Sequence, residues 1–286
     1  MTVLGVRFSG LRPPDFDATV GLLDADLHRT QDASACVHLL VWIDLHRKRK
    51  QLMAIENQPK TALVVGASRG IGLGLVRELL SRSWSVYATE RGAPATSKLR
   101  TLAAESNGKL HVFSADLNVP ADIANLKGDL GTAQLDLLYI NAGVSDDPKQ
   151  TAAEISTEEF QHLMLTNALS PLRAIETLSG AVKPEGSIAV MSSMLGSISS
   201  NTDGGYEAYR ASKAALNTLM RSYAARAGAK RSLLALHPGW VKTDMGGPDA
   251  TLDVAASAAG LITTAEKHAG QPGLVFVDYA DQAIAW

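Results

Sequence analysis

Hydrophobic positions follow two alternating patterns from about residue 60 onward. Short apolar runs with the length of a buried strand are separated by stretches in which apolar residues recur every three or four positions. The strand-like runs cover residues 62–65, 85–89, 110–114, 135–140, 187–191, 233–236 and 274–277. The helical pattern is longest over residues 157–178, 206–227 and 253–267. This alternation predicts an α/β fold: a doubly wound, Rossmann-like parallel sheet of about seven strands with helices on both faces.

The first 52 residues lack any sustained period. They contain Pro13-Pro14, scattered acidic residues and a basic run over residues 46–50, which is more often a solvated face than a phosphate-binding segment. We therefore expect residues 53–286 to form one domain. Residues 1–52 are expected to be a disordered, loosely attached extension, or else a non-native one, with Met53 as the true start.

Composition narrows the classes of partner. With 46% hydrophobic and 20% charged residues, the 286-residue chain is typical of a soluble globular protein. A net charge of −2 gives no reason to expect nucleic acid or an anionic membrane as partner. No stretch approaches the ~20 apolar residues of a membrane span or resembles a signal peptide. The single cysteine, Cys36, excludes an intrachain disulfide, offers no cysteine metal cluster and favours a cytoplasmic setting.

The stretch over residues 61–80 combines a strand pattern, three glycines and a helix pattern. Gly66, Gly70 and Gly72 give the spacing G-x-x-x-G-x-G. Gly66 allows the strand to turn, and Gly70 and Gly72 allow backbone and helix to approach a pyrophosphate. The free N–H groups at the start of the helix favour that anion. The stretch predicts a dinucleotide site, with a simple tight turn as the alternative.

Residues near this loop bear on the choice of nicotinamide cofactor. Glu90 follows Gly70 by twenty positions and ends the second strand, where an acidic residue binds the adenosine ribose hydroxyls and favours NAD. Arg69 and Arg91 would instead hold a 2′-phosphate, if Glu90 pairs with an arginine and moves away from the ribose. Two arginines against one carboxylate favour NADP(H), with NAD(H) as the other possibility.

Tyr209 and Lys213 form the strongest candidate pair for acid–base chemistry. They are four residues apart on a predicted helix and so share one face. A tyrosine with a pKa near 10 needs a nearby cation to act as acid or base at neutral pH, and Lys213 would supply it. Ser193 ends the fifth strand, where ligands bind in doubly wound sheets. The alternatives are a surface tyrosine packed on a lysine stem and a serine that caps a loop.

Three further polar positions are candidates. Asn141-Ala142-Gly143 ends the fourth strand, where either a nucleotide or a turn requires a small backbone. Asn167 lies inside a predicted helix, although asparagine is a mediocre helix former. Asp116 follows the third strand and would accept a bond from an adenine amino group or cap the next segment.

Taken in order, these motifs resemble those of the short-chain dehydrogenase/reductases. The resemblance covers residues 61–286 and adds Asp116-Leu117 and His237-Pro238-Gly239 to the motifs above. The segments HPGWVKTDMGG over residues 237–247 and FVDYADQAIAW over residues 276–286 resemble the C-factor and sniffer-like carbonyl reductases.

The resemblance implies hydride transfer between a nicotinamide and a carbonyl or alcohol. Tyr209 would be the proton donor or base, Lys213 would lower its pKa and hold the ribose, and Ser193 would orient the carbonyl oxygen. Asn167 would hold a proton-relay water, and Thr243 would contact the carboxamide. The implied cofactor contacts also include Ser68, Ile71, Leu117, Ala142, Pro238, Gly239 and Val241. A homodimer or homotetramer is usual in such proteins.

Two departures from the family pattern and one alternative function accompany the resemblance. Ile140 stands where the family usually has asparagine, which removes one expected hydrogen bond between strands. The interval between Ser193 and Tyr209 is longer than usual, so residues 201–205 are expected to shape or cover the substrate site.

The alternative function is a nucleotide-binding signalling or regulatory protein on the same fold.

Overall fold

The chain divides into two units, residues 1–58 and 59–286, that are described separately. The computed structural model describes residues 41–47, 59–92, 96–228 and 231–286. In the first unit, residues 41–47 form a short helix. The boundary that we expected at residue 52 lies outside the described residues. The second unit, called the main domain below, holds all the motifs discussed above.

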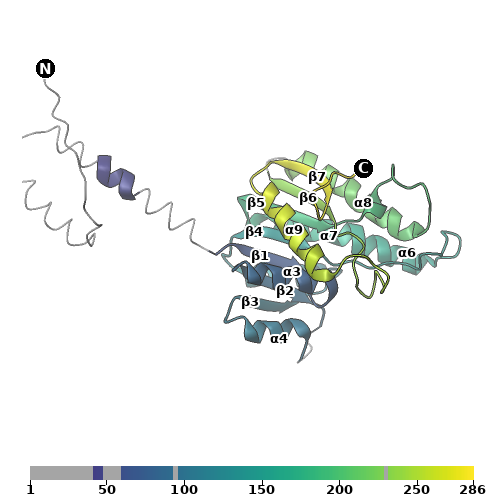
Figure 1. The fold of residues 1–286 in the computed structure, drawn as a ribbon, viewed down its shortest axis with the longest axis horizontal. Coiled ribbons are helices and arrows are strands. Elements are labelled where there is room, and N and C mark those ends of the chain that lie inside the picture. The colour runs from purple at the N-terminus through teal and green to yellow at the C-terminus, as the bar shows by residue number, and fades with distance from the viewer. Residues whose placement is uncertain (1–40, 48–58, 93–95, 229–230) are drawn as a thin grey trace, which may run out of the picture. The chain divides into compact units, whose positions relative to one another are not determined.

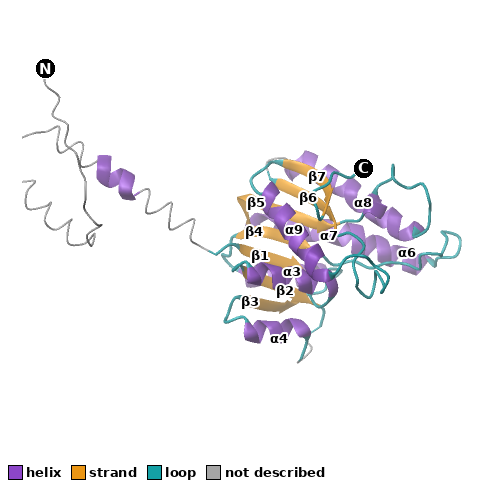
Figure 2. Ribbon diagram, viewed as in Figure 1, coloured by secondary structure: helices purple, strands orange, loops and turns teal. Residues whose placement is uncertain are grey.

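The main domain is built on a sheet of seven parallel strands, drawn in orange in Figure 2. Its strands are β1 (Thr61–Val65), β2 (Ser85–Glu90), β3 (Leu110–Ser114), β4 (Leu135–Ile140), β5 (Val182–Met191), β6 (Ser232–His237) and β7 (Gly273–Asp278). Their order across the sheet is β3-β2-β1-β4-β5-β6-β7. Each predicted strand is present, and the predicted fold class is confirmed.

Helices cover both faces of the sheet (Figure 1). They are α3 (Gly70–Ser81), α4 (Lys98–Glu105), α5 (Pro120–Leu130), α6 (Thr157–Met164), α7 (Ser170–Leu178), α8 (Glu207–Tyr223) and α9 (Val254–His268). The run predicted over residues 157–178 is not one regular helix. A π-helical turn, Leu165–Leu169, separates α6 from α7 and contains Asn167. Such turns are frequent at functional sites.

The sheet separates two hydrophobic layers. Alternate residues of β1 point to opposite faces: Ala62 and Val64 pack with α3 and α9, whereas Leu63 and Val65 pack with α5, α7 and α8. Burial on both faces explains why the strands are almost continuously apolar. Ile140, which replaces the expected asparagine, is 1% exposed and belongs to the second layer. Apolar packing of Ile140 thus replaces the hydrogen bond that an asparagine would make at this position.

Strand order reverses at the centre of the sheet, between β1 and β4. The connection from β1 leads to β2 on one side, whereas β4 and the later strands extend to the other. Crossovers on opposite sides leave a crevice at the carboxyl ends of these two strands, where ligands bind in sheets of this type. Within the described residues, no helix combines the length and apolar character needed to cross a bilayer.

Candidate active site

A cavity of about 620 Å³ opens at the carboxyl ends of the strands. This central cavity brings together most of the predicted site residues, although they come from distant parts of the sequence. Those that line it are Gly66, Ser68, Arg69, Gly70, Ile71, Glu90, Arg91, Leu117, Asn141, Ala142, Gly143, Ser193, Tyr209, Lys213, Pro238, Gly239, Val241 and Thr243. Three predicted residues, Gly72, Asp116 and Asn167, are not part of the lining.

The glycine loop between β1 and α3 forms one wall of the central cavity. Gly66 has a φ of +87°, and a Cβ there would lie 2.7 Å from the Cβ of Ala142. The amide of Asn141 donates to the Gly66 carbonyl at 2.7 Å and joins the loop to the end of β4. Gly72 has a packing role instead, because its Cβ would lie 2.2 Å from the Gly66 carbonyl oxygen. The loop thus offers a close, side-chain-free backbone surface.

Glu90 is 2% exposed and pairs with an arginine that we did not predict as its partner. Its Oε1 accepts a bond of 2.7 Å from Nε of Arg100 on α4. Its Oε2 is buried and has no hydrogen-bond partner among the described residues. Arg91 lines the same end of the central cavity. Glu90 is therefore neutralised by Arg100, and the guanidinium of Arg91 is the cation at this end of the lining.

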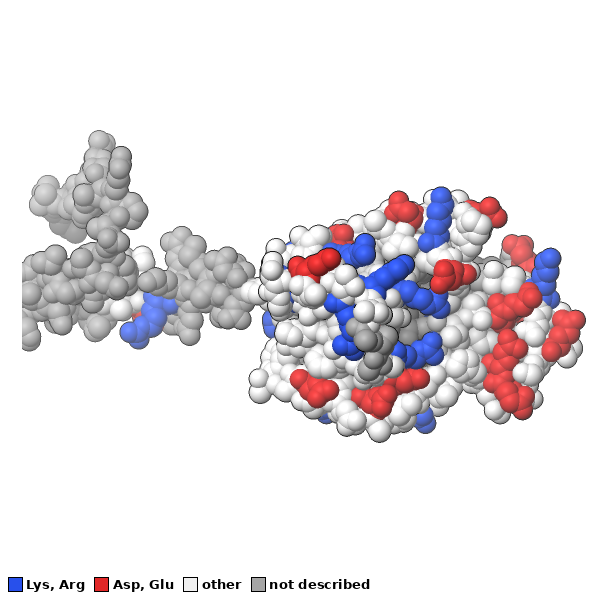
Figure 3. Space-filling view, turned by 90° about the horizontal axis from the view of Figure 1, so that it is seen from below, with Lys and Arg blue, Asp and Glu red and all other residues white. Residues whose placement is uncertain are grey.

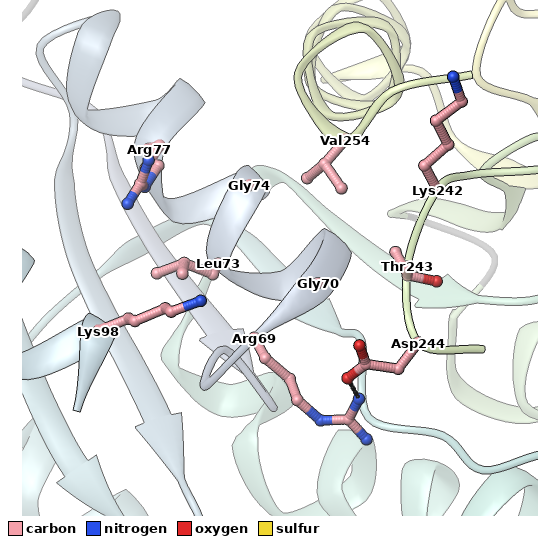
Figure 4. A pocket seen from close by; sticks show the side chains of 10 residues that line it. All are labelled: Arg69, Gly70, Leu73, Gly74, Arg77, Lys98, Lys242, Thr243, Asp244 and Val254. Atoms are coloured by element: carbon pink, nitrogen blue, oxygen red, sulfur yellow. Dashed lines mark hydrogen bonds and ion pairs between the residues drawn. The ribbon is translucent and has the colours of Figure 1, made fainter. Parts of the chain in front are cut away.

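Arg69 forms an exposed ion pair with Asp244, on the loop after β6 (Figure 4). This pair lines a second cavity of about 360 Å³, together with Arg77, Lys98 and Lys242. Basic side chains also gather near the middle of the domain surface seen in Figure 3. This end of the site is therefore suited to anions.

Tyr209 lies near the start of α8 and lines the central cavity. The pKa of Tyr209 is raised to about 12. Desolvation by burial is the largest cause, a hydrogen bond with Ser193 acts in the opposite direction, and Asp146 and Tyr206 contribute smaller increases. The direction is opposite to the one that we expected from a neighbouring ammonium. The physical reason is that desolvation disfavours the phenolate.

Lys213 lies below Tyr209 and is itself buried, with 2% exposure. Its Nζ donates to the Met191 carbonyl at 2.8 Å and lies 5.6 Å from the Tyr209 ring centroid. Burial lowers the pKa of Lys213 to about 7. Desolvation thus disfavours the charged form of the lysine, which weakens its effect on Tyr209.

Asn167 is fully buried and holds the chain that follows β4. Its amide makes two bonds with Val144, to the carbonyl at 2.8 Å and from the N–H at 2.9 Å, and a third with the Ser212 hydroxyl at 2.9 Å. A Cβ on Gly143 would lie 3.3 Å from Asn167 Oδ1 and 3.4 Å from Lys213 Nζ. Both amide hydrogens are used, and a relay water at Asn167 stays a prediction.

Asp116 and residues 201–205 lie outside the central cavity. Oδ1 of Asp116 accepts a bond of 2.8 Å from the Asn118 N–H, which closes a turn after β3. The contact of Asp116 is therefore of the kind expected if this residue caps the next segment. Residues 201–205 do not line the cavity, but the next residue, Tyr206, does. The longer interval thus affects the site through Tyr206 rather than by covering it.

The family model for short chain dehydrogenases matches residues 60–251, which include all these strands except β7. The chain belongs to the short-chain dehydrogenase family. The structure is similar to that of a carbonyl reductase from Pseudomonas aeruginosa PAO1 in complex with NADP, with 42% identity, a TM-score of 0.75 and coverage of 80% of this chain and all of the other.

Two other relatives are similar to this chain. The carbonyl reductase Sniffer of D. melanogaster has 31% identity and a TM-score of 0.72, over 80% of this chain and all of the fly protein. The curated protein C-signal of Myxococcus xanthus is 36% identical over 165 residues, which are 54% of this chain and 95% of the relative.

Several residues of this short-chain dehydrogenase site were not selected as site residues from the sequence. Tyr206, Trp240, Met194 and Met245 line the central cavity, and Asp146 contacts the first turn of α8. Trp240 and Met245 lie within the quoted 237–247 segment and could have been selected as neighbours of Thr243. Asp146 gave no local signal, because its partners are more than 60 residues away.

Proposed function

We propose that this protein is an NADP(H)-dependent carbonyl reductase in which Tyr209 transfers the proton. The main support for this proposal is that Tyr209, Ser193 and Lys213 line the same cavity as the glycine loop. A protein that only bound a nucleotide would have no need of a phenol beside that loop. The likeness to two carbonyl reductases supports the reaction class.

The described residues fit a dinucleotide with a 2′-phosphate. The glycine loop offers backbone to the pyrophosphate, and Glu90 lines the cavity at the end of β2, where an acidic residue would face the ribose. Arg69 and Arg91 would hold the phosphate, since Glu90 is neutralised by Arg100. The Pseudomonas structure with NADP supports this choice. NAD(H) is the second possibility, because the Glu90 oxygen also suits an unphosphorylated ribose.

In this proposal Tyr209 gives its proton to the carbonyl oxygen while the bound nicotinamide supplies the hydride. A pKa of about 12 keeps the phenol protonated at neutral pH, which suits reduction. Ser193 holds the carbonyl oxygen beside the phenol. Lys213 would hold the ribose and lower the cost of forming the phenolate. Alcohol oxidation would require an alkaline solution, because Tyr209 must first lose its proton.

The Tyr209→Phe variant tests the catalytic assignment. We expect loss of NADPH-dependent carbonyl reduction with nearly unchanged cofactor affinity, because the ring remains and only the proton donor is lost. Turnover is measured from NADPH absorbance, and binding from nicotinamide fluorescence. Tyr87→Phe, on β2 and outside the cavity lining, serves as the control and should keep its turnover. Full activity of Tyr209→Phe would refute the assignment.

The cofactor assignment is tested by titrating the protein with NADPH and with NADH while nicotinamide fluorescence is recorded. We expect tighter binding of NADPH because Arg69 and Arg91 have a phosphate to contact. Tighter binding of NADH would contradict the proposal.

The alternative is a signalling or regulatory protein that binds a nucleotide on the same fold. It draws support from the relative named C-signal. Cofactor binding without turnover in the unmodified protein would favour this alternative. Homodimer or homotetramer assembly and a cytoplasmic location also stay predictions, which light scattering and cell fractionation would check.

A further inference from the structure

Large apolar side chains surround the end of the central cavity beyond Tyr209. We call Met194, Leu195, Tyr206, Trp240 and Met245 the apolar rim; they come from the segments after β5, before α8 and after β6. Met194, Trp240 and Met245 are 46%, 54% and 51% exposed. Scattered exposed apolar residues are ordinary, but several around one opening indicate a binding surface.

Trp240 presents only its apolar surface to the cavity. Its one polar atom, Nε1, donates to the Gly246 carbonyl at 2.8 Å within the same loop. That loop is further held by the Thr243 hydroxyl, which accepts from the Gly246 N–H at 3.1 Å. The exposed indole is therefore a fixed aromatic surface with no unused donor.

Tyr206 adds a second ring in a costly backbone conformation. Its φ of 53° lies in the left-handed region, which side chains other than those of Gly, Asn and Asp rarely adopt. The N–H of Tyr206 donates to the Pro148 carbonyl at 3.1 Å, and its ring meets the Tyr209 ring edge-on at 6.3 Å between centroids. Strained residues cluster at functional sites, and this one brings an aromatic edge beside the phenol.

The ionised side chains that line the central cavity are already paired or lie at the end of β2. Glu90 pairs with Arg100, Arg69 pairs with Asp244, and Arg91 follows β2. Near the rim, Lys213 is buried and already donates to Met191. Among the described residues of the lining, the rim therefore has no unpaired exposed cation for a substrate carboxylate or phosphate. An anion there would lose water without gaining a countercharge.

We propose that the substrate carries its carbonyl on an uncharged, apolar and flat group, such as an aromatic or conjugated ring. This inference rests on the proposed carbonyl reductase function and adds a substrate class to it. The bound cofactor would supply a hydride to the carbonyl carbon and Tyr209 would supply a proton to the oxygen, which gives a neutral alcohol and the oxidised cofactor. The Tyr209 phenolate would then regain its proton from solvent. The rim excludes 2-oxo acids and phosphorylated carbonyl compounds.

A matched pair of substrates tests the charge requirement. Ethyl benzoylformate and the benzoylformate anion share the ring and the reacting carbonyl but differ by one negative charge. With NADPH and the full chain, we expect kcat/KM to be at least about tenfold higher for the ester, since an unpaired charge in an apolar site costs more than about 1.4 kcal/mol. Ethyl pyruvate, which lacks the ring, should have a lower kcat/KM than the aromatic ester.

Variants assign the preference to the rim. Trp240→Ala should raise KM for the aromatic ester, whereas Trp240→Phe should retain much of the preference because it keeps a ring. Met245→Lys should raise kcat/KM for the anion relative to that for the ester, because the lysine supplies a countercharge. Ile198→Ala is the control: Ile198 is 73% exposed but lies outside the cavity lining, so kcat and KM should not change.

The outcomes separate the two proposals. If the anion is reduced as well as the ester, or Trp240→Ala leaves the ester preference intact, the substrate class is wrong and the carbonyl reductase function stands. If neither compound nor any other carbonyl consumes NADPH, both proposals are wrong. Ester preference that falls with Trp240→Ala and remains with Ile198→Ala supports the rim.

Discussion

Asp146 acts on Tyr209 in two ways. Its Oδ2 accepts bonds of 3.1 Å from the N–H groups of Ala208 and Tyr209 and so caps α8. The helix lacks a side-chain cap of its own, because Tyr206 occupies that position without such a bond. The charge of Asp146 also raises the pKa of Tyr209, after the larger effect of desolvation. One carboxylate thus affects both the position and the acidity of the phenol.

The Asp146→Asn variant separates these effects, because an amide oxygen can still cap the helix. Loss of the charge should lower the pKa of Tyr209, so that the phenolate forms at lower pH. The rise in alcohol oxidation with pH should therefore move toward neutral, as measured by kcat/KM profiles. Asp146→Ala also removes the cap and should lower the free energy of unfolding by about 1 kcal/mol.

Glu207→Gln is the matched control for Asp146. Glu207 is a nearby carboxylate that accepts a bond of 2.7 Å from the Ala152 N–H, but its charge does not contribute to the Tyr209 shift. The pH profile of kcat/KM for Glu207→Gln should coincide with that of the unmodified protein. An unchanged profile for Asp146→Asn would show that the charge has no effect on Tyr209.

Asp244 competes with the proposed cofactor phosphate for Arg69. Because the Arg69–Asp244 pair is exposed, its contribution is small. Asp244→Asn should increase NADPH affinity by up to about fivefold and leave NADH affinity almost unchanged. Fluorescence titrations at low and high salt measure this effect. Weaker binding of NADPH would instead mean that Asp244 supports the cofactor site.

At the scale of elements, glycines set how closely α9 approaches the chain after β7. A Cβ on Gly260 of α9 would lie 2.5 Å from the Tyr279 carbonyl oxygen, whereas a Cβ on Gly128 of α5 would meet nothing within 4 Å. Both glycines occupy helices, so their intrinsic cost relative to alanine is similar. Packing alone distinguishes them.

Gly260→Ala and Gly128→Ala should therefore change stability in opposite directions. We expect Gly260→Ala to lower the free energy of unfolding by about 1–3 kcal/mol through overpacking. Gly128→Ala should raise it by about 0.5–1 kcal/mol, because alanine favours the helix and meets no obstacle. Urea unfolding measures both changes, and the same sign for the two would contradict this account of α9.

For the whole molecule, the described core lies entirely within the main domain. Its two hydrophobic layers include no described residue before Ala62. A chain that starts at Met53 should keep the melting temperature and the NADPH-dependent turnover of the full chain. A chain that lacks residues 1–65 also loses β1 from the centre of the sheet and should not fold. A large loss of stability in the first deletion would assign a structural role to residues 1–52.

The sequence by itself determined the fold class and the places of the strands. Burial on both faces makes a central strand continuously apolar, and a helix shows its buried stripe every three or four residues, so both signals are local. The motifs also identified most residues of the central cavity, because all those that line it, except the Tyr209/Lys213 pair on α8, follow the end of a strand, and the carboxyl ends of parallel strands meet at one edge.

Only the tertiary structure decided how those side chains are paired and solvated. Arg100 rather than Arg69 or Arg91 neutralises Glu90, Asp146 caps α8 from a distant loop, and the rim around Trp240 forms from three segments. Desolvation likewise raised the pKa of Tyr209, where the spacing to Lys213 alone suggested a lower one. Contacts and loss of water depend on which distant residues pack together, and no local pattern of residues records that.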